Sequence, residues 1–306
     1  MAMRYADLFA GAGGAHLGLF QAGLEPVAAV EHDAAACQVL TDAGWPTEPT
    51  DVREWTPVAA DLWWASPPCQ AFSTAGSRLG PGDERNGWPW LIDALDRADT
   101  MPTWLMCENV AGMTYHEETC SPTCPACYLA VVLGELRKRF RCVTHAVLNA
   151  ANYGIPQRRR RLIIVAGPEV YRWPAQTHSG RGGVGLFGST LPWVSMGDAI
   201  DLNGGRLIGA GTRPHGPGRE HERTHRDITH EPAPCVTAAQ IGNAGPWVEG
   251  EQRRRLTVRE CAALQTFPPD WPWYGTKEQQ YRQIGNACPP LLIQVLGTTL
   301  LRQVSP

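Results

Sequence analysis

The sequence predicts an α/β fold, a doubly wound parallel sheet flanked by helices, joined to a smaller domain. Two observations predict the sheet: apolar runs of strand length alternate with helical stretches as far as Ala166, and glycine-rich or polar turns follow the runs. A third predicts the smaller domain, because from about Gly167 the composition shifts to Gly, Pro, His and Arg. We expect a main domain over residues 1–175, a small domain over 176–277 and a terminal helix over 278–306 that returns to the main domain.

Composition and charge are those of a globular protein. The chain has 306 residues, is 43% hydrophobic and carries a formal net charge of −3. No apolar run approaches the ~20 residues of a membrane span, no signal-like region opens the chain, and ten scattered cysteines argue for reduced thiols. We therefore expect a cytoplasmic protein without a membrane partner. Eight basic residues and no acidic one between Arg137 and Arg161 predict a local positive surface.

The individual elements follow from apolar periodicity and from the turns between the apolar runs. Strands are short buried runs, and helices show apolar residues at helical spacing. The predicted strands are Arg4–Phe9, Pro26–Val30, Asp61–Ala65, Thr103–Cys107, Arg141–Leu148 and Leu162–Ala166, and the predicted helices of the main domain run to Gly23 and over Tyr128–Phe140.

The first strand ends in a glycine turn, Ala10-Gly11-Ala12-Gly13-Gly14, which leads into a helix. Glycines let the backbone approach a ligand at a helix N-terminus, although a plain tight turn between strand and helix gives the same pattern. The acid Glu31 at the end of the second strand favours a nucleoside site, since it can hold ribose hydroxyls. Asp51 can accept a hydrogen bond from an adenine amino group while Val52 packs on the ring; the alternative for Asp51 is a helix N-cap.

We expect the catalytic chemistry to take place at Cys69, which follows a strand and the stiff turn Pro67-Pro68. The carboxyl edge of an open α/β sheet is where ligands bind, so a thiol there is placed to act as a nucleophile. The alternative is a buried structural cysteine. The long Gly- and Pro-containing loop Ala71–Trp90 beside it predicts a lid.

Two further polar segments end or begin predicted strands. Glu108-Asn109-Val110 follows a neighbouring strand, which suits Glu108 to donate a proton or hydrogen bond to a ring nitrogen, unless it is an ordinary exposed glutamate. In the extended run 157–161, alternate residues face the same way. Gln157, Arg159 and Arg161 are therefore expected on one side, directed at an anionic or base-edge ligand.

A short polar insert carries metal-ligand residue types. His116, Cys120, Cys124 and Cys127 have close spacing compatible with a structural tetrahedral zinc, although the spacing is not that of a standard finger. Reduced cysteines without a metal are the alternative.

The small domain is expected to be irregular, with a strand-like run at Pro234–Ala238. A helix over Arg255–Gln265 is predicted to begin with a Thr257 cap and Glu260, the capping-box arrangement, and an apolar helix over Leu291–Leu301 ends the chain.

Taken in order along the chain, the motifs closely resemble those of the DNA cytosine-5 methyltransferases. They are Asp7-Leu8-Phe9-Ala10-Gly11-Ala12-Gly13-Gly14, Glu31, Asp51, Pro67-Pro68-Cys69-Gln70, Glu108-Asn109-Val110, Gln157-Arg158-Arg159-Arg160-Arg161, the Arg255–Gln265 helix and Gln283-Ile284-Gly285-Asn286-Ala287.

The resemblance implies S-adenosylmethionine as cofactor, double-stranded DNA as partner and a sheet of the S-adenosylmethionine-dependent methyltransferase type. Cys69 would attack carbon 6 of a flipped-out cytosine, Glu108 would engage the ring nitrogen and amine, and Arg159 would bind the base carbonyl. The implied cofactor residues are Phe9, Gly11, Gly13, Gly14, Glu31, Asp51, Val52, Pro67, Asn286 and Ala287, and the implied substrate residues are Gln70, Ser73, Asn109, Val110, Gln157 and Arg161.

Two features of the sequence depart from the family pattern. The region between Arg159 and Arg255, which reads DNA sequence in this family, is short and glycine-rich, so the recognised sequence is not predicted. The cysteine insert is not part of the common pattern. We expect a monomeric enzyme. The alternatives are a tRNA cytosine-5 methyltransferase and a non-catalytic DNA-binding protein of the same fold.

Overall fold

The chain folds into two compact units, each built from separate stretches of the sequence. In the computed structural model, the first unit comprises Met1–Leu148, Arg160–Pro174 and Leu292–Pro306, and the second comprises Asn149–Arg159 and Ala175–Leu291. This partition is not the same as the predicted domains, because 149–159 and 278–291 also belong to the second unit. The structure describes residues 2–68, 86–115, 124–180, 182–185, 188–212, 223–237, 247–250 and 254–305.

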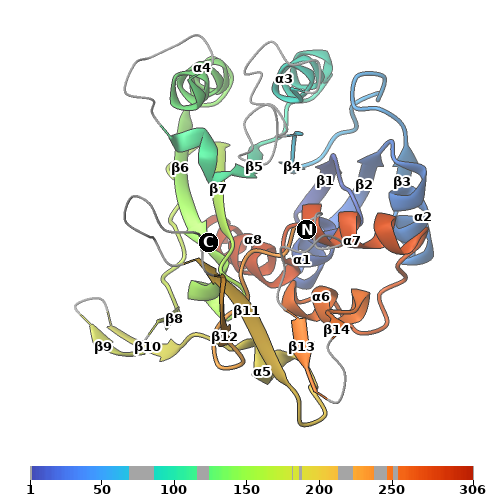
Figure 1. Ribbon diagram of the computed structural model, residues 1–306. Coiled ribbons are helices and arrows are strands. Elements are labelled where there is room, and N and C mark those ends of the chain that lie inside the picture. Colours follow the sequence, from blue (N-terminus) through green and yellow to red (C-terminus); the bar gives the residue numbers. More distant parts are fainter. Residues whose placement is uncertain are drawn as a thin grey trace. The chain divides into compact units, whose positions relative to one another are not determined.

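The first unit is built on a seven-stranded sheet with the order β3-β2-β1-β4-β5-β7-β6 (Figure 1). The neighbouring strands from β3 to β5 in this order pair in parallel, as predicted, but β7 runs antiparallel to β5. The prediction of a purely parallel sheet was therefore wrong at this strand. The strands are β1 (Arg4–Leu8), β2 (Glu25–Glu31), β3 (Thr47–Pro49), β4 (Leu62–Ala65), β5 (Trp104–Val110), β6 (Cys142–Asn149) and β7 (Arg160–Gly167).

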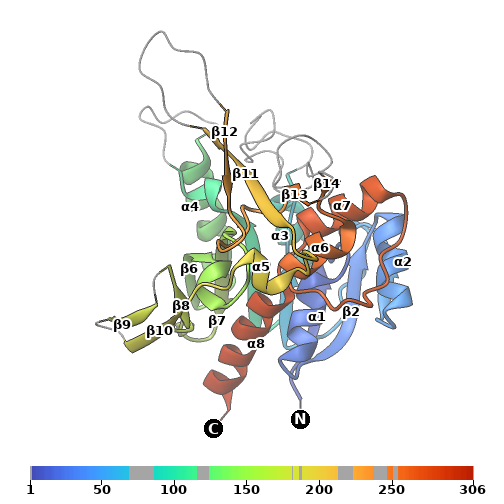
Figure 2. The same cartoon turned by 60° about the horizontal axis from the view of Figure 1, so that its bottom comes forward.

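Helices cover both faces of this sheet, which is what doubly wound means. One face packs against α3 (Trp88–Arg97) and α4 (Pro125–Arg137) in a single apolar cluster (Figures 1 and 2). Alternate strand residues point into it, as the two-residue period of a strand requires. The strand side chains in this cluster are Ala6, Leu8, Ala28, Val30, Trp63, Ala65, Leu105, Cys107, Leu162, Ile164 and Ala166.

The helices α1 (Gly14–Gln21) and α8 (Pro290–Val304) pack closely against each other in the same unit. A Cβ on Gly297 of α8 would lie 2.9 Å from the Cβ of Ala22, the residue that ends α1. The hydroxyl of Tyr171 donates a 2.9 Å hydrogen bond to the carbonyl of Leu296. The helix α2 (Ala34–Asp42) begins with an Asp33 cap and contributes Leu40 to a small cluster with Ala29 of β2.

The parallel strands end at one edge of the sheet, where the predicted site residues follow them. Leu8 of β1 pairs with Ala65 of β4, and Ala65 pairs with Cys107 of β5. The residues that come next, Phe9 and Ser66 among them, therefore share this edge, as expected for the ligand edge of an open α/β sheet.

The second unit contains two small sheets and is more regular than predicted. One sheet has the order β8-β10-β9 and the other β12-β11-β13-β14. The predicted strand-like run Pro234–Ala238 forms no strand over its described residues, 234–237. Ala233, directly before this run, makes an isolated bridge with Gln157. The elements are η3 (Ala150–Tyr153), β8 (His178–Ser179), β9 (Gly183–Gly185), β10 (Gly188–Pro192), α5 (Met196–Ala199), β11 (Arg206–Thr212), β12 (Arg223–Asp227), β13 (Trp247–Glu249), β14 (Arg254–Arg255), α6 (Val258–Leu264) and α7 (Lys277–Asn286).

Local capping determines where α6 begins. The Thr257 hydroxyl accepts from the Glu260 amide at 3.2 Å, and the Glu260 carboxylate accepts from the Thr257 amide at 2.6 Å. This confirms the predicted capping box. Among the described residues, Lys277–Val304 is the one helical stretch long and apolar enough to cross a membrane by length and composition, and 56% of its most apolar window is buried, as in a core helix.

Candidate active site

The glycine turn after β1 adopts the backbone that its sequence predicts. Gly11 has a φ of 54° and Gly13, which caps α1, has a φ of 83°. Phe9 also has a positive φ, 59°, which is uncommon for a residue with a bulky side chain. A Cβ added at Gly11 would meet nothing within 4 Å, so its backbone angle, rather than crowding, favours glycine there.

Glu31, at the end of β2, is held by the backbone. Its Oε2 accepts a 2.8 Å hydrogen bond from the Gly11 amide, and its Oε1 accepts from the amides of His32 at 2.8 Å and Asp33 at 2.7 Å. The residue is 8% exposed. An ionised carboxylate has about four acceptor positions, so Oε2 keeps capacity for a hydroxyl donor.

Asp51 lies on a turn with Val52 and Arg53, not at the N-terminus of a described helix. Arg53 binds it in a fork, from Nε to Oδ1 at 2.9 Å and from Nη2 to Oδ2 at 2.8 Å. These hydrogen bonds hold the pKa of Asp51 below its ordinary value. Val52 is buried in the apolar cluster that includes α3 and α4, with 3% of its surface exposed, and its contact with adenine stays a prediction.

The turn after β4 is anchored by the next strand. The Nδ2 of Asn109 donates a 3.1 Å hydrogen bond to the carbonyl of Pro67, and its Oδ1 accepts from the amide of Val110. Asn109 is 1% exposed. Asn109 therefore fixes the backbone directly before Pro68. The proposed nucleophile Cys69, with Gln70 and Ser73, lies outside the described residues, as does the predicted lid up to residue 85; Trp88–Trp90 already belong to α3.

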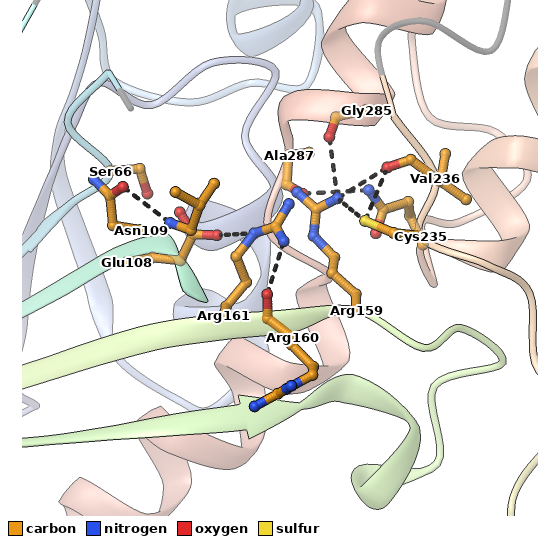
Figure 3. Close-up of polar contacts among 12 residues, drawn as sticks. Ser66, Glu108, Asn109, Arg159, Arg160, Arg161, Cys235, Val236, Gly285 and Ala287 are labelled. Carbon is orange, nitrogen blue, oxygen red and sulfur yellow. Dashed lines mark hydrogen bonds and ion pairs between the residues drawn. The ribbon is translucent and has the colours of Figure 1, made fainter. Parts of the chain in front are cut away.

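Glu108 faces an arginine across the antiparallel pair of β5 and β7. Val110 lies opposite Arg161, and Glu108 lies two residues earlier on the same face, which makes Glu108 and Arg161 diagonal neighbours. The Nε of Arg161 is 2.6 Å from the Oε1 of Glu108, with side-chain exposures of 15% and 11% (Figure 3). Glu108 is buried, 8% exposed, and Arg161 is half-buried. A carboxylate with its arginine can present hydrogen-bonding groups to a planar ring.

The predicted alternation along 157–161 is confirmed by burial. Gln157 and Arg159 are buried and Arg161 is half-buried, whereas Arg158 and Arg160 are exposed. The sides on which these residues lie were therefore predicted from the two-residue period.

Arg159 belongs to a buried network inside the second unit (Figure 3). Its Nη1 donates to the carbonyls of Val236 at 3.0 Å and Gly285 at 3.1 Å, and its Nη2 donates to the carbonyl of Ala287 at 2.8 Å. The Cys235 sulfur lies 3.6 Å from Nη1. With 1% of its surface exposed, Arg159 is held by these backbone carbonyls, and its predicted contact with a base carbonyl stays a prediction.

Two glutamines extend this network, and one of them was missed from the sequence. Gln157 donates to Leu264 and to the side chain of Gln265 at 3.0 Å. Gln265 in turn donates to the carbonyl of Ile284 at 2.6 Å, at the end of α7. The predicted cofactor residues Asn286 and Ala287 follow there, Asn286 exposed and Ala287 9% exposed.

The predicted metal ligands are only partly described. Cys124 is buried and Cys127 half-buried at the start of α4, while His116 and Cys120 lie outside the described residues. Within the part of the chain that the structure describes, no group of three or more His, Cys, Asp or Glu residues is placed to hold a metal ion.

Comparison with known proteins identifies the family of the chain. Residues 3–180 and 206–302 match the C-5 cytosine-specific DNA methylase family. The chain is 33% identical to the Type II methyltransferase M.AplI of Arthrospira platensis over 96% of this chain and 84% of the relative. It is 31% identical to M.NgoMIV of Neisseria gonorrhoeae over 97% and 96%.

Two solved structures share the fold at low sequence identity. The Dnmt2 methyltransferase of S. pombe has a TM-score of 0.69 at 17% identity, with 100% of both chains covered. The Entamoeba histolytica methyltransferase EhMeth has a TM-score of 0.68 at 13% identity, again over 100% of both chains.

The sheet order, the glycine turn and the carboxylate after β2 define the fold of S-adenosylmethionine-dependent methyltransferases. Within that class, the chain belongs to the C-5 cytosine-specific DNA methylase family, and it is a DNA cytosine-5 methyltransferase.

Proposed function

We propose that this protein methylates carbon 5 of cytosine at one short sequence of double-stranded DNA, with Cys69 as the nucleophile. The observation that supports this most directly is the Glu108–Arg161 pair at 2.6 Å, on the strand whose Asn109 anchors the turn before Cys69. An acid for the cytosine ring and the approach to the thiol thus come from adjacent strand ends.

The first unit contains groups that fit S-adenosylmethionine. Glu31 would accept ribose hydroxyls, Asp51 the adenine amino group, and Phe9 and Val52 would contact the adenine ring. The absence of atoms within 4 Å of a Cβ at Gly11 is consistent with a ligand above the turn. When bound, S-adenosylmethionine supplies the methyl group. Asn286 and Ala287 remain predicted contacts of the methionine end.

The reaction would begin with the cytosine turned out of the duplex, because a thiol cannot reach carbon 6 within the stack. The Cys69 thiolate forms a bond to carbon 6 while Glu108 hydrogen-bonds the ring nitrogen and the exocyclic amine. Electron density moves to carbon 5, which accepts the methyl group. Loss of the carbon 5 proton to water and departure of the Cys69 thiolate then restore the aromatic ring.

We assign the contact with the base carbonyl to Arg161 rather than Arg159. Arg161 is half-buried beside Glu108, whereas Arg159 donates to three backbone carbonyls. Gln157 acts with Arg159 in that network, so its predicted substrate contact is also replaced by a supporting role. Gln70, Ser73 and Val110 remain predicted substrate contacts.

The test is methyl transfer from labelled S-adenosylmethionine to a random-sequence duplex library and to tRNA in competition, with sequencing of 5-methylcytosine. We expect label at one short duplex sequence, and none with Cys69→Ser. Label confined to tRNA would support the tRNA alternative, and cofactor binding without transfer to either would support a non-catalytic protein. Full activity of Cys69→Ser would exclude the mechanism.

We propose that the enzyme is a monomer and that it acts in the cytoplasm. Relatives such as M.AplI are named Type II methyltransferases, which favours a role beside a restriction enzyme. Size-exclusion chromatography with light scattering should give the mass of one chain.

A structural zinc at the cysteine insert is a second proposal. It rests on Cys124 and Cys127, which lie one helical turn apart at the start of α4. Protein purified without added zinc should contain about one equivalent, lost in Cys124→Ser and Cys127→Ser but retained in Cys142→Ser. Folded, zinc-free protein would remove the proposal.

A further inference from the structure

The turn Pro67-Pro68, which leads to Cys69, packs against the residue that caps α3. Gly87 is the N-cap of α3 and is buried. A Cβ added at Gly87 would lie 2.4 Å from the Cδ of Pro68 and 3.0 Å from the Cβ of Pro67. Gly87 has a φ of −78°, which any residue adopts, so crowding by the two prolines is what requires glycine here.

The backbone before Cys69 is therefore held from two sides. From β5, the Nδ2 of Asn109 donates a 3.1 Å hydrogen bond to the carbonyl of Pro67. From the start of α3, Gly87 lies against Pro68. Because proline rings restrict the backbone angle φ, the turn has little freedom to absorb a displacement, which would pass on to Cys69.

Asn86, directly before Gly87, is fixed by its side chain. It is 3% exposed. Its Oδ1 accepts a 3.3 Å hydrogen bond from the amide of Trp88, and its Nδ2 donates to the hydroxyl of Tyr128 at 2.6 Å. Trp88 is itself buried in the apolar cluster between the sheet and the helices α3 and α4. Gly87 thus lies between two residues that are held in place by the rest of the first unit.

Tyr128 is in turn fixed by the first turn of α4. Its amide donates to the carbonyl of Cys124 at 3.1 Å, and the amide of Ala126 donates to the carbonyl of Tyr115 at 3.1 Å. Burial raises the pKa of Tyr128 above its ordinary value, so the hydroxyl stays protonated at neutral pH. The start of α4, where the cysteine insert ends, is therefore connected through Asn86 to the turn before the proposed nucleophile.

We propose that Asn86 and Tyr128 are positioning residues for the nucleophile, acting on the backbone before Cys69 through the contact of Gly87 with Pro68. The inference rests on the proposed function and adds to it two residues that need not touch substrate or cofactor. A hydrogen bond that only satisfied a buried amide would stabilise the fold and leave the chemistry unchanged. Kinetics separate these two roles.

The experiment measures how fast Cys69 bonds to carbon 6 of the target base. The probe is the duplex that the wild-type enzyme methylates, with 5-fluorocytosine at the target, because fluorine cannot leave carbon 5 as a proton does and the protein stays bonded to the DNA. Tyr128→Phe should slow adduct formation at saturating cofactor about 2- to 12-fold, the factor that one hydrogen bond supplies, with unchanged affinity for S-adenosylmethionine. Tyr274→Phe, at an exposed tyrosine, is the control and should react as wild type.

A double-mutant cycle tests whether the two residues act together. All variants are assayed well below their unfolding temperatures. Asn86→Ala combined with Tyr128→Phe should be no slower than Asn86→Ala alone, because the hydrogen bond is lost once in either case. Additive effects on the adduct rate, or coupling in thermal unfolding without coupling in the adduct rate, overturn the inference.

A pair of glycine variants gives a second readout that does not depend on this hydrogen bond. Gly87→Ala should slow adduct formation about 10²-fold, the effect of misplacing reacting groups by about 1 Å, because its Cβ must displace Pro68. Gly134→Ala on α4 is the matched control, since its Cβ would meet nothing within 4 Å and the reaction should keep its wild-type rate. A wild-type rate in Gly87→Ala overturns the inference.

The two levels of the proposal fail differently. Wild-type protein that methylates duplex DNA without forming the adduct contradicts the proposed Cys69 mechanism, and this inference with it. Adduct formation by the wild type, together with wild-type rates in Tyr128→Phe and Gly87→Ala, leaves that mechanism intact and removes only the positioning role.

Discussion

Arg159 and Arg161 are two residues apart on the same side of one segment, yet their environments differ. Arg159 is 1% exposed and donates to the carbonyls of Val236, Gly285 and Ala287 within the second unit. Arg161 is partly exposed in the first unit, 2.6 Å from the Glu108 carboxylate. The first arrangement satisfies buried backbone oxygens, and the second leaves a charged pair available to a ligand. Equal spacing therefore does not mean equal function.

The largest expected effect concerns Glu108, the carboxylate that pairs with Arg161. Glu108→Gln keeps the shape but removes the acid, and we expect transfer to fall by about 10²- to 10⁴-fold, the usual contribution of a general acid or base. Thermal unfolding should change little. Glu135→Gln, at an exposed ion pair on α4, is the control and should retain activity. Retention of most activity by Glu108→Gln would remove Glu108 from the chemistry.

The second effect is on stability. Arg159→Met leaves the carbonyls of Val236 and Gly285 without this donor, and each unsatisfied buried group costs about 1–3 kcal/mol. We expect the free energy of unfolding to fall by about 2–6 kcal/mol, measured in urea. Arg160→Met is the matched control, because Arg160 is exposed and should change stability by less than about 0.5 kcal/mol. A stable but inactive Arg159→Met would return Arg159 to the catalytic residues.

The third effect is on activity and not on stability, the reverse of what we expect for Arg159. Arg161→Lys keeps the charge but loses the planar fork, and we expect about a 10- to 100-fold lower kcat with nearly unchanged stability. Arg160→Lys should behave as wild type in both assays. If Arg161→Lys unfolds the protein instead, the two arginines have similar structural roles and the contrast between them is lost.

The smallest effect tests whether a third arginine, Arg53, supports ligand binding. Arg53 holds the pKa of Asp51 below its ordinary value, so the ionised acceptor for adenine persists as the pH falls until that lowered pKa is reached. In Arg53→Met the pKa of Asp51 rises, and cofactor affinity should be lost at a higher pH than in wild type. Calorimetry across an acid pH series measures this. An acid limb that does not move, or one that moves equally in exposed Arg141→Met, contradicts it.

Features governed by local rules could be predicted from the sequence. The glycine turn and the Thr257–Glu260 capping box depend on neighbouring residues, and the structure contains them. The predicted strand ends at Val30 and Cys107 were wrong, because β2 continues through Glu31 and β5 through Val110. The alternation along 157–161 also follows from the strand period.

Features governed by distant partners could not be predicted. The direction of β7 depends on which strand it joins, and Arg159 meets Gly285 126 residues further along the chain. The two-residue period of a strand predicts the face on which a side chain lies, but it does not predict which distant residues the side chain contacts there. The Arg53–Trp90 contact likewise joins a turn to a helix with no periodic signal between them. The predicted roles of Cys69, Gln70 and Ser73 stay predictions, since these residues lie outside the described part.

The division of the chain has a consequence for synthesis on the ribosome. The chain passes between the units after Leu148, Arg159, Pro174 and Leu291, so neither unit is continuous. The first unit is complete only after Leu292–Pro306 has been made, and the second only after Leu291 has been made. Domains generally fold as units during synthesis, the N-terminal one first. Here a nascent chain that has not yet reached Leu291 lacks residues of both units, so neither unit can be complete before that point.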